Sequence, residues 1–444
     1  MNGPPTEERA LSKCIWYISK YVAIPDQGEP VSRPIGLLRE TARRGFRTLL
    51  ITASANYKFA NPDHGEVVAS RTESVDGIEV IRVPTTGFKS RKSFRRMLSW
   101  ISFEVALAAM PKSSWPKPDV VVVSSLSLLT VLNGLALKWR YGCRLVFEVR
   151  DIWPLTLVAE LGYRADNPLV RLLAAVEKLG YLRSDAIVGT MPNLSEHVAA
   201  ITDGRRSAEC VPMGVDTEAI DETVPLPAAA AAALFPPEKF IVGYAGSVSV
   251  SNALETFLEC ARSLAAHEGV HFALVGDGDL HQEYVDRFGS LPNVTIGDAI
   301  PREQVQSFLS RCDLLYFAVH KSQVWQYGLS LNKLIDYMMS AKPIVASYSG
   351  YPSMVNEADC GTFVPAADVD ALRAEILRYE AMSPAEREQV GRRGRSWLLQ
   401  HRAYDRLAND YLAIMFPEPS QPTQPDKGVR NPGTLPAEAG SRVS

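Results

Sequence analysis

Short apolar runs alternate with amphipathic stretches along most of the chain. Two of the runs, VVVV at 120–123 and LLYFAV at 314–319, are apolar throughout, which is typical of strands buried on both faces of a parallel sheet. The intervening stretches have helical periodicity, as at 32–44, or start with a proline that suits a first helical turn, as at 301–310. We therefore predict an α/β fold with doubly wound parallel sheets. The predicted strands are 14–19, 47–52, 78–83, 119–124, 144–149, 186–189, 209–212, 240–244, 270–275, 293–296, 313–319, 343–346 and 362–364.

A break in the strand pattern at 221–238 divides the chain. This segment contains four prolines and a run of alanines, and we expect a loop and a short helix there. Seven predicted strands precede it and six follow, so the sequence predicts two Rossmann-like domains, at 1–215 and 216–396. The tail at 417–444 has six prolines and few apolar residues, and we expect it to be disordered.

Composition excludes several classes of protein. The 444 residues include 47 Lys and Arg against 50 Asp and Glu, a net charge of −3, which argues against a partner held by bulk charge, such as a nucleic acid. The six cysteines and seven histidines show no metal-ligand spacing, so we expect no metal and no disulfide framework. No signal segment and no apolar run of about 18 residues is visible, which favours a cytoplasmic protein.

Polar loops follow several predicted strands, at the sheet edge where ligands bind in open α/β folds. The segment RDIWP follows the strand at 144–149, and its Arg150 and Asp151 are either functional or a buried pair that orders the loop. The segment GDGD at 276–279 lacks the third glycine of a dinucleotide fingerprint and further ligands for a metal, so a tight turn is the simpler interpretation. The candidate substrate-binding residues in these loops are Gly28, Gly246, Ser247, Lys321, Asn332, Lys333 and Asp336.

The segment 320–336 carries the clearest chemistry. A polar loop leads to Asn332 and Lys333 at the start of a predicted helix, and helix N-termini bind phosphates through free N–H groups. Lys333 would add a positive charge, and Asp336, one turn into the helix, could accept hydrogen bonds from ribose hydroxyls. The alternative is a surface loop in which Asn332 caps the helix.

The order of these motifs resembles the family 4 glycosyltransferases of the GT-B fold, closest to the fucosaminyltransferase-like subgroup that builds bacterial O-antigen and capsule repeats. The resemblance covers 14–416. It rests on YVAIPDQGEPVSRP, EVRDIWP, VPMGVD, VGYAGSVS, FALVGDGD, YGLSLNKLIDYMMSAKPIVAS and GYPSMVNEADCGTFVP.

The resemblance implies two domains facing a cleft, with a nucleotide-sugar donor, expected to be UDP-linked, in the second domain. The acceptor, a polyprenyl-linked sugar or glycan, would lie in the first domain beside Arg150 and Asp151, and a helix at 397–416 would pack back on that domain. Transfer would retain the anomeric configuration and need no metal or cofactor. This chain departs from the family at Gly328, where a sugar-binding Glu is usual, and at 245–252, which carries no cation.

Two other functions stay open at this point. One is a sugar-nucleotide epimerase or phosphorylase of the same architecture, because a fold does not fix a reaction. The other is a non-catalytic subunit that binds a sugar nucleotide, which the missing Glu and cations would suit.

The segment 87–110 joins basic residues to an apolar helical stripe. Lys89, Arg91, Lys92, Arg95 and Arg96 lie near its start, and Leu98, Ile101 and Val105 share one helical face. This pattern is typical of a helix lying on an anionic membrane, so we expect peripheral binding to the inner face of the plasma membrane. The alternative is a domain helix packed on the sheet.

Overall fold

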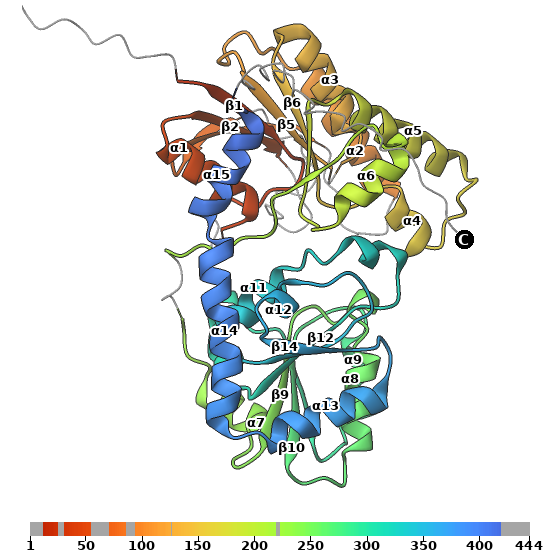
Figure 1. Ribbon diagram of the computed structural model, residues 1–444, viewed down its shortest axis with the longest axis vertical. Helices are drawn as coiled ribbons and strands as arrows, with labels where there is room; N and C mark the ends of the chain where they lie inside the picture. The colour runs from red at the N-terminus through yellow and green to blue at the C-terminus, as the bar shows by residue number, and fades with distance from the viewer. Residues whose placement is uncertain are drawn as a thin grey trace, which may run out of the picture.

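The computed structural model contains two parallel-sheet α/β domains, one above the other in Figure 1. It describes residues 12–24, 31–54, 71–85, 94–125, 127–218 and 223–418, with side chains of the helix at 94–109 described from Leu98 onward. Gly28, residues 86–93 and residues 419–444 lie outside the described part of the chain. The predicted α/β class with doubly wound sheets is confirmed.

The N-terminal sheet has the strand order β3-β4-β2-β1-β5-β6-β7-β8. Helices α1 and α15 cover one face of this sheet, and α2, α3, α5 and α6 cover the other (Figure 1). The strands are β1 (Cys14–Ile18), β2 (Arg47–Ala53), β3 (Arg71–Val75), β4 (Ile78–Val83), β5 (Val120–Ser124), β6 (Arg144–Val149), β7 (Ala186–Gly189) and β8 (Glu209–Cys210). The helices are α1 (Arg33–Arg43), α2 (Phe94–Ala109), α3 (Thr130–Tyr141), α4 (Leu155–Ala159), α5 (Pro168–Arg183) and α6 (Leu194–Thr202).

The C-terminal sheet has the order β11-β10-β9-β12-β13-β14, and all its pairs are parallel. Its strands are β9 (Phe240–Ala245), β10 (Val270–Val275), β11 (Val294–Gly297), β12 (Leu314–Ala318), β13 (Ile344–Ser347) and β14 (Gly361–Val364). Its helices are α7 (Ala228–Leu234), η2 (Val250–Asn252), α8 (Glu255–Ser263), α9 (His281–Phe288), η3 (Arg302–Gln304), α10 (Val305–Arg311), η4 (Gln323–Tyr327), α11 (Asn332–Met339), α12 (Met354–Glu357) and α13 (Val369–Ala381). Helices α14 (Pro384–Arg402) and α15 (Tyr404–Met415) end the described chain.

Every strand expected from the sequence is present, with ends that differ by no more than two residues, but β3 was not predicted. β3 pairs antiparallel with β4 at the edge of the sheet. Asp76 and Gly77 join the two strands with φ angles of 50° and 80°. An Asp-Gly turn with positive φ at both residues is a strong hairpin signal, but RTESV is too polar to be recognised as a strand by hydrophobicity.

The helix expected at 397–416 is divided into α14 and α15 by Ala403. Ala403 has an extended conformation, with φ −62° and ψ 139°, and forms a parallel bridge with Val215. The Val215 amide donates to Arg402 O at 2.8 Å, and the Tyr404 amide donates to Val215 O at 3.2 Å. The helix therefore breaks because its backbone pairs with the segment that enters the second domain. Helix α15 then packs against α1 of the first domain (Figure 1).

A buried ion pair ties this crossing point to the N-terminal sheet. The Arg33 guanidinium contacts the Glu148 carboxylate at 2.7 Å, and both side chains are fully buried. Arg33 also donates to the carbonyls of Val211 and Pro212, at 2.7 and 3.0 Å. Burial raises the pKa of Glu148, but the charges of Arg33 and Arg150 and the hydrogen bonds from Tyr17 and Arg33 together outweigh this and hold the pKa below its ordinary value.

We expect Arg33→Met to lower the free energy of unfolding by about 3–5 kcal/mol, because it leaves a buried carboxylate without its partner. Arg33→Met/Glu148→Leu should recover most of that loss. The pair stabilises the fold fully at neutral pH, and its contribution falls as the pH drops below the ordinary Glu pKa, because the folded-state pKa is the lower one.

Urea denaturation of the variants measures these effects. Arg43→Met is the matched control, since Arg43 pairs with Glu218 at the surface, where an ion pair contributes about 0–1 kcal/mol. Equal losses for Arg33→Met and Arg43→Met would contradict the assignment.

Candidate active site

A cavity of about 340 Å³ lies at the carboxyl edge of the C-terminal sheet, beyond β9, β10 and β11. Most of the polar groups that line it come from the β9 loop and from α11, which the sequence analysis had singled out. The lining residues are Ala245, Gly246, Ser247, Val275, Gly276, Asp277, Ala299, Ile300, Arg302, Val305, Lys333, Asp336 and Tyr337.

Two glycine-containing loops form one wall of the cavity by backbone packing. A Cβ atom on Gly276 would lie 1.9 Å from the carbonyl oxygen of Gly246, and one on Gly278 would lie 2.2 Å from that of Val248. The Val248 amide donates to Asp277 O at 2.9 Å. The GDGD segment therefore forms a tight turn. Its glycines let the loop after β10 lie directly on the loop after β9. In the described part of the chain no group of three or more His, Cys, Asp or Glu side chains has metal-site geometry.

Lys333 brings a partly buried amine into this cavity. Its Nζ donates to Tyr244 Oη at 3.0 Å and to Asn252 Oδ1. Tyr244 Oη in turn donates to Ser247 O at 2.7 Å, which ties the lysine to the β9 loop. Burial lowers the pKa of Lys333 to about 7, because no carboxylate compensates for the lost hydration. The amine is therefore poised to gain a proton when an anion enters the cavity.

Asp336 lies one turn further along α11 and is held by a residue the sequence analysis did not name. Both of its carboxylate oxygens accept hydrogen bonds from the Arg302 guanidinium, one at 2.7 Å. Arg302 lies in η3, after β11, and its side chain is about half exposed at the cavity. Arg302 thus provides a second cation in the cavity, beside Lys333, whereas the loop after β9 carries none.

The other predicted donor residues lie around this cavity in different ways. Gly246 and Ser247 line it, whereas Asn332 is exposed at the start of α11 and Lys321 is exposed in the loop after β12. Neither Asn332 nor Lys321 makes a side-chain hydrogen bond or ion pair to another described residue. Gly28 lies outside the described residues.

Arg150 and Asp151 lie at the carboxyl edge of the N-terminal sheet, and their charges act on different groups. Arg150 is partly buried and its charge favours the ionised form of Glu148. Burial raises the pKa of Glu160. The charge of His320, in the second domain, lowers this pKa, and the exposed Asp151 raises it further. Glu160 of the first domain therefore lies within the electrostatic range of His320 of the second domain.

The two domains contact each other directly at η4. The Asn193 amide donates to Tyr327 O at 3.0 Å, and the ring of Tyr327 lies 5.1 Å from that of His197. Gly328 follows, with φ +104°, and a Cβ atom there would lie 2.5 Å from Pro192 of the first domain. The close approach of Pro192 thus explains why this position holds a glycine, since a Glu side chain would collide with the first domain.

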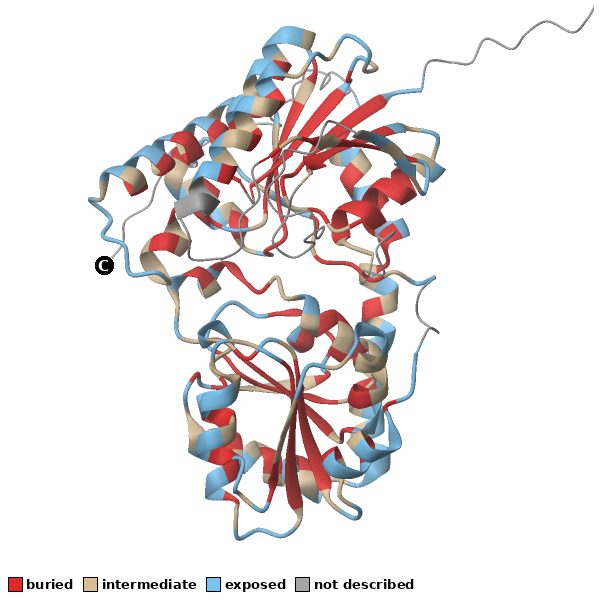
Figure 2. Ribbon diagram, turned by 180° about the vertical axis from the view of Figure 1, so that it is seen from behind, coloured by how far each residue is buried: buried red, intermediate tan, exposed pale blue. Residues whose placement is uncertain are grey.

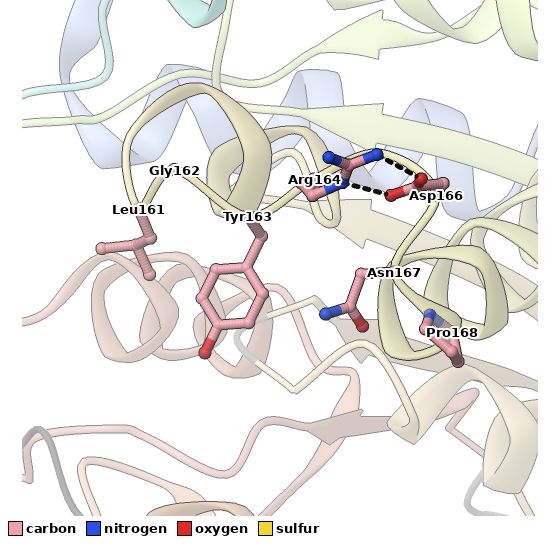
Figure 3. Close-up of a pocket in the computed structure, with 7 residues that line it drawn as sticks. All are labelled: Leu161, Gly162, Tyr163, Arg164, Asp166, Asn167 and Pro168. Carbon is pink, nitrogen blue, oxygen red and sulfur yellow. Dashed lines mark hydrogen bonds and ion pairs between the residues drawn. The ribbon is translucent and has the colours of Figure 1, made fainter.

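A second hollow, of about 510 Å³, lies at the surface of the N-terminal domain between α4 and α5 (Figure 3). Its ionic groups, Arg164 and Asp166, are paired with each other at 2.7 Å and highly exposed. It is a shallow surface feature without convergent polar groups, so the cavity at α11 is the better candidate for a ligand site.

Two family models match the chain, one in each domain. Residues 35–214 match a glycosyl transferase 4-like domain, and residues 239–381 match glycosyl transferases group 1. The first match covers β2 to β8 of the N-terminal sheet, and the second covers all six strands of the C-terminal sheet. The chain belongs to the glycosyltransferases of the GT-B type.

Solved structures agree with this glycosyltransferase in fold. A sucrose-phosphate synthase from Thermosynechococcus elongatus has a TM-score of 0.69 at 18% identity, covering 90% of this chain and 98% of its own. A UDP-forming trehalose-phosphate synthase from Burkholderia xenovorans has a TM-score of 0.67 at 13% identity, covering 91% and 99%. The Anabaena protein HepE in complex with UDP and glucose has a TM-score of 0.59 at 13% identity, covering 90% and 98%. A search of curated proteins gives no match.

The sequence analysis of this glycosyltransferase missed Arg302, Tyr244 and Asn252. Arg302 stands in the segment PREQ, which reads as an ordinary helix start, and only the packing of η3 beside α11 brings it to Asp336. Tyr244 is part of an apolar strand, and no sequence signal distinguishes it from a core residue. The hydroxyl groups and amides that orient Lys333 were therefore not predictable from spacing.

We expect one lysine of the folded protein to titrate near pH 7 and to be absent from Lys333→Met. Because the folded-state pKa of Lys333 is below its unfolded value, unfolding takes up a proton between pH 7 and about 10.4. The free energy of unfolding of the wild type should therefore rise relative to that of Lys333→Met across this range.

NMR of protein labelled with ¹³C at the lysine ε carbons measures the titration, and denaturation at several pH values measures the stability. Lys321→Met is the control, since Lys321 is exposed. If every lysine titrates above pH 9, the buried-amine interpretation is wrong.

Proposed function

We propose that this glycosyltransferase moves a sugar from a nucleotide-sugar donor, UDP-linked, to a lipid-linked or glycan acceptor in the synthesis of a bacterial surface polysaccharide such as lipopolysaccharide. The donor binds in the cavity at α11 and the acceptor binds at the carboxyl edge of the N-terminal sheet. The reaction retains the configuration at the anomeric carbon and uses no metal.

The position of Lys333 is the observation that carries this proposal. Its Nζ lies in the cavity beside the β9 loop, and a Cβ atom on Gly246 would be only 3.7 Å from it. A diphosphate placed there would be bound by the charged Lys333 amine and by the N–H groups of the loop. Its negative charge would favour the protonated form of Lys333, which burial disfavours. Asn332 and Lys321, both exposed on the same side of β12, are proposed as further contacts.

The remaining walls of the cavity suit a nucleoside. Asp336 would accept hydrogen bonds from the two ribose hydroxyls while Arg302 holds its carboxylate in place. Ala299, Ile300 and Val305 provide an apolar wall against which a base can lie. Phosphate, ribose and base contacts thus follow one another along a single cavity.

The acceptor side is assigned to Arg150 and Asp151. Both follow β6 at the carboxyl edge of the N-terminal sheet, and Asp151 is close enough to Glu160 to influence its pKa. Arg150 would orient the acceptor for attack on the anomeric carbon.

The proposed chemistry needs orientation more than a strong base. The bond between the anomeric carbon and the diphosphate oxygen breaks, and the acceptor oxygen forms its bond on the same face. The acceptor proton passes to the departing diphosphate, whose negative charge Lys333 stabilises. Closure of the two domains around the reactants would exclude water from the site.

A lipid-linked acceptor requires access to a membrane surface, which we assign to 87–110. Part of this segment lies outside the described residues, but α2 is described and presents Leu98, Ile101 and Val105 to solvent. Its inner face packs on the sheet through Phe103 and Leu107. No described helix is long and apolar enough to span a bilayer.

We expect Lys333→Met to weaken binding of UDP about tenfold to a hundredfold, because a charge-assisted contact contributes about 1.5–3 kcal/mol. UDP affinity should also fall as the pH rises through 7 in the wild type, but not in Lys333→Met, because only the protonated amine attracts the diphosphate. Asp336→Asn should weaken UDP more than its 2′,3′-dideoxy analogue. Isothermal titration calorimetry measures these affinities.

Transfer from radiolabelled UDP-sugars to lipid-linked acceptors tests the activity itself. Lys117→Met, which changes an exposed lysine of the first domain, provides the comparison for the affinity series. Turnover of the donor without an acceptor would indicate an epimerase or a phosphorylase, and binding without turnover across donors and acceptors would indicate a non-catalytic subunit. Unchanged UDP affinity in Lys333→Met would overturn the donor assignment.

We expect Arg150→Ala to lower kcat at least tenfold while UDP affinity stays within twofold, because Arg150 lies in the other domain from the donor cavity. The measurement is steady-state transfer together with UDP binding. Arg144→Ala, at the opposite end of β6, is the control for general effects on the strand. If Arg150→Ala only lowers the melting temperature and keeps normal specific activity, the residue orders its loop instead.

A further inference from the structure

Three helices that are distant in sequence share one face of the N-terminal domain. Helices α2, α3 and α5 all cover the same side of the sheet, α2 contacts α3, and α3 contacts α5. Figure 1 shows them opposite α1 and α15. Their outward sides therefore form a continuous surface, which we call the three-helix face.

The exposed residues of these helices are of two kinds only. From Leu98 onward every exposed residue of α2, α3 and α5 is either apolar or an arginine, and none is acidic. They are Leu98, Ile101, Val105, Ala108, Ala109, Leu132, Ala136, Trp139, Arg140, Pro168, Arg171, Leu172, Ala175, Leu179 and Arg183.

The apolar side chains form stripes at helical spacing. Leu98, Ile101 and Val105 follow one another at three and four residues on α2, and the exposed large residues of α3 and α5 are spaced at seven. Trp139 is 90% exposed. Each helix also has a separate buried stripe that packs on the sheet, so the outward stripes are not needed for the core.

The turn that precedes α5 extends the same surface. Leu161 is 62% exposed and Tyr163 is 42% exposed, and their side chains point to the same side of the turn in Figure 3. Nine of the twelve exposed large apolar residues in the described chain thus lie on α2, α3, α5 or this turn.

The second domain shows what an ordinary exposed helix of this protein looks like. The fully exposed residues of α9 are Gln282, Glu283, Asp286 and Arg287, all polar or charged. Figure 2 shows exposed surface on the outer helices of both domains, but only the first domain presents large apolar side chains in stripes. The helices of both domains are exposed, but the residue types that they expose are different.

We propose that the three-helix face is a docking surface for an anionic lipid bilayer. Exposed apolar stripes would insert among the acyl chains, Trp139 would lie at the headgroup level, and Arg140, Arg171 and Arg183 would contact lipid phosphates. None of the described exposed residues of the three helices is acidic, and the exposed Asp166 of the adjoining turn is paired with Arg164 at 2.7 Å, so its negative charge is compensated. A surface that binds a protein more commonly has a polar rim around its apolar centre.

This inference rests on the proposed function in one respect only: the lipid-linked acceptor of that proposal gives a reason for the protein to bind a bilayer. It extends the membrane contact from one helix to three, because α3 and α5 contribute arginines and apolar residues that are described in full. The surface also leaves the donor cavity, in the other domain, open to solvent.

Sedimentation of the full-length protein with vesicles tests the proposal. We expect binding to phosphatidylcholine vesicles that contain phosphatidylglycerol, none to phosphatidylcholine alone, and loss of binding at high salt. Arg140→Gln/Arg171→Gln/Arg183→Gln should weaken binding about fivefold per arginine, or about a hundredfold in total. Trp139→Gln/Leu172→Gln should weaken it at least tenfold.

The control replaces three exposed arginines of the second domain, Arg378→Gln/Arg392→Gln/Arg395→Gln, and should leave vesicle binding within twofold. Thermal melting and UDP affinity show whether each variant is folded. Absence of binding to anionic vesicles at low salt would overturn the proposal. So would self-association in sedimentation velocity that Trp139→Gln/Leu172→Gln abolishes, because the face would then bind a second copy. Vesicle binding without any glycosyl transfer would contradict the proposed function alone.

Discussion

The buried pair of Arg33 and Glu148 is the interaction on which the arrangement of the two domains depends. Glu148 also accepts hydrogen bonds from Tyr17 of β1 and Tyr411 of α15, so one carboxylate joins the first strand, the sixth strand and the last helix. Arg33 binds the carbonyls of the segment that leads to the second domain. Because both charges are fully buried, removing either leaves the other uncompensated, and the crossing point is held in one position.

The cavity at α11 is built on the opposite principle, since its buried amine has no carboxylate partner. Lys333 is held by a phenol and an amide, which fix its position without neutralising it. Asp336, by contrast, is already paired with Arg302. An entering anion therefore meets one cation whose charge is uncompensated and one whose charge is shared. This arrangement favours a ligand with its negative charge at the Lys333 end.

The two domains differ in their outer surfaces. The second domain presents a polar exterior and a nucleoside-sized cavity, whereas the first presents the three-helix face. The domains meet through η4, where Gly328 lets the loop after β12 approach Pro192. The same close contact that excludes a Glu from this position brings His320 within the field of Glu160.

The sequence alone determined the fold class, nearly every strand and two of the segments that line the cavity at α11, because buried strands need continuous apolar runs and polar loops follow their carboxyl ends. It also placed Lys333 and Asp336 one turn apart on one helix. Only the tertiary structure paired Asp336 with Arg302 and surrounded Lys333 with Tyr244 and Asn252, since these contacts join segments more than 30 residues apart. It likewise divided the last helix at Ala403 through a bridge to Val215, which no local pattern of residues encodes.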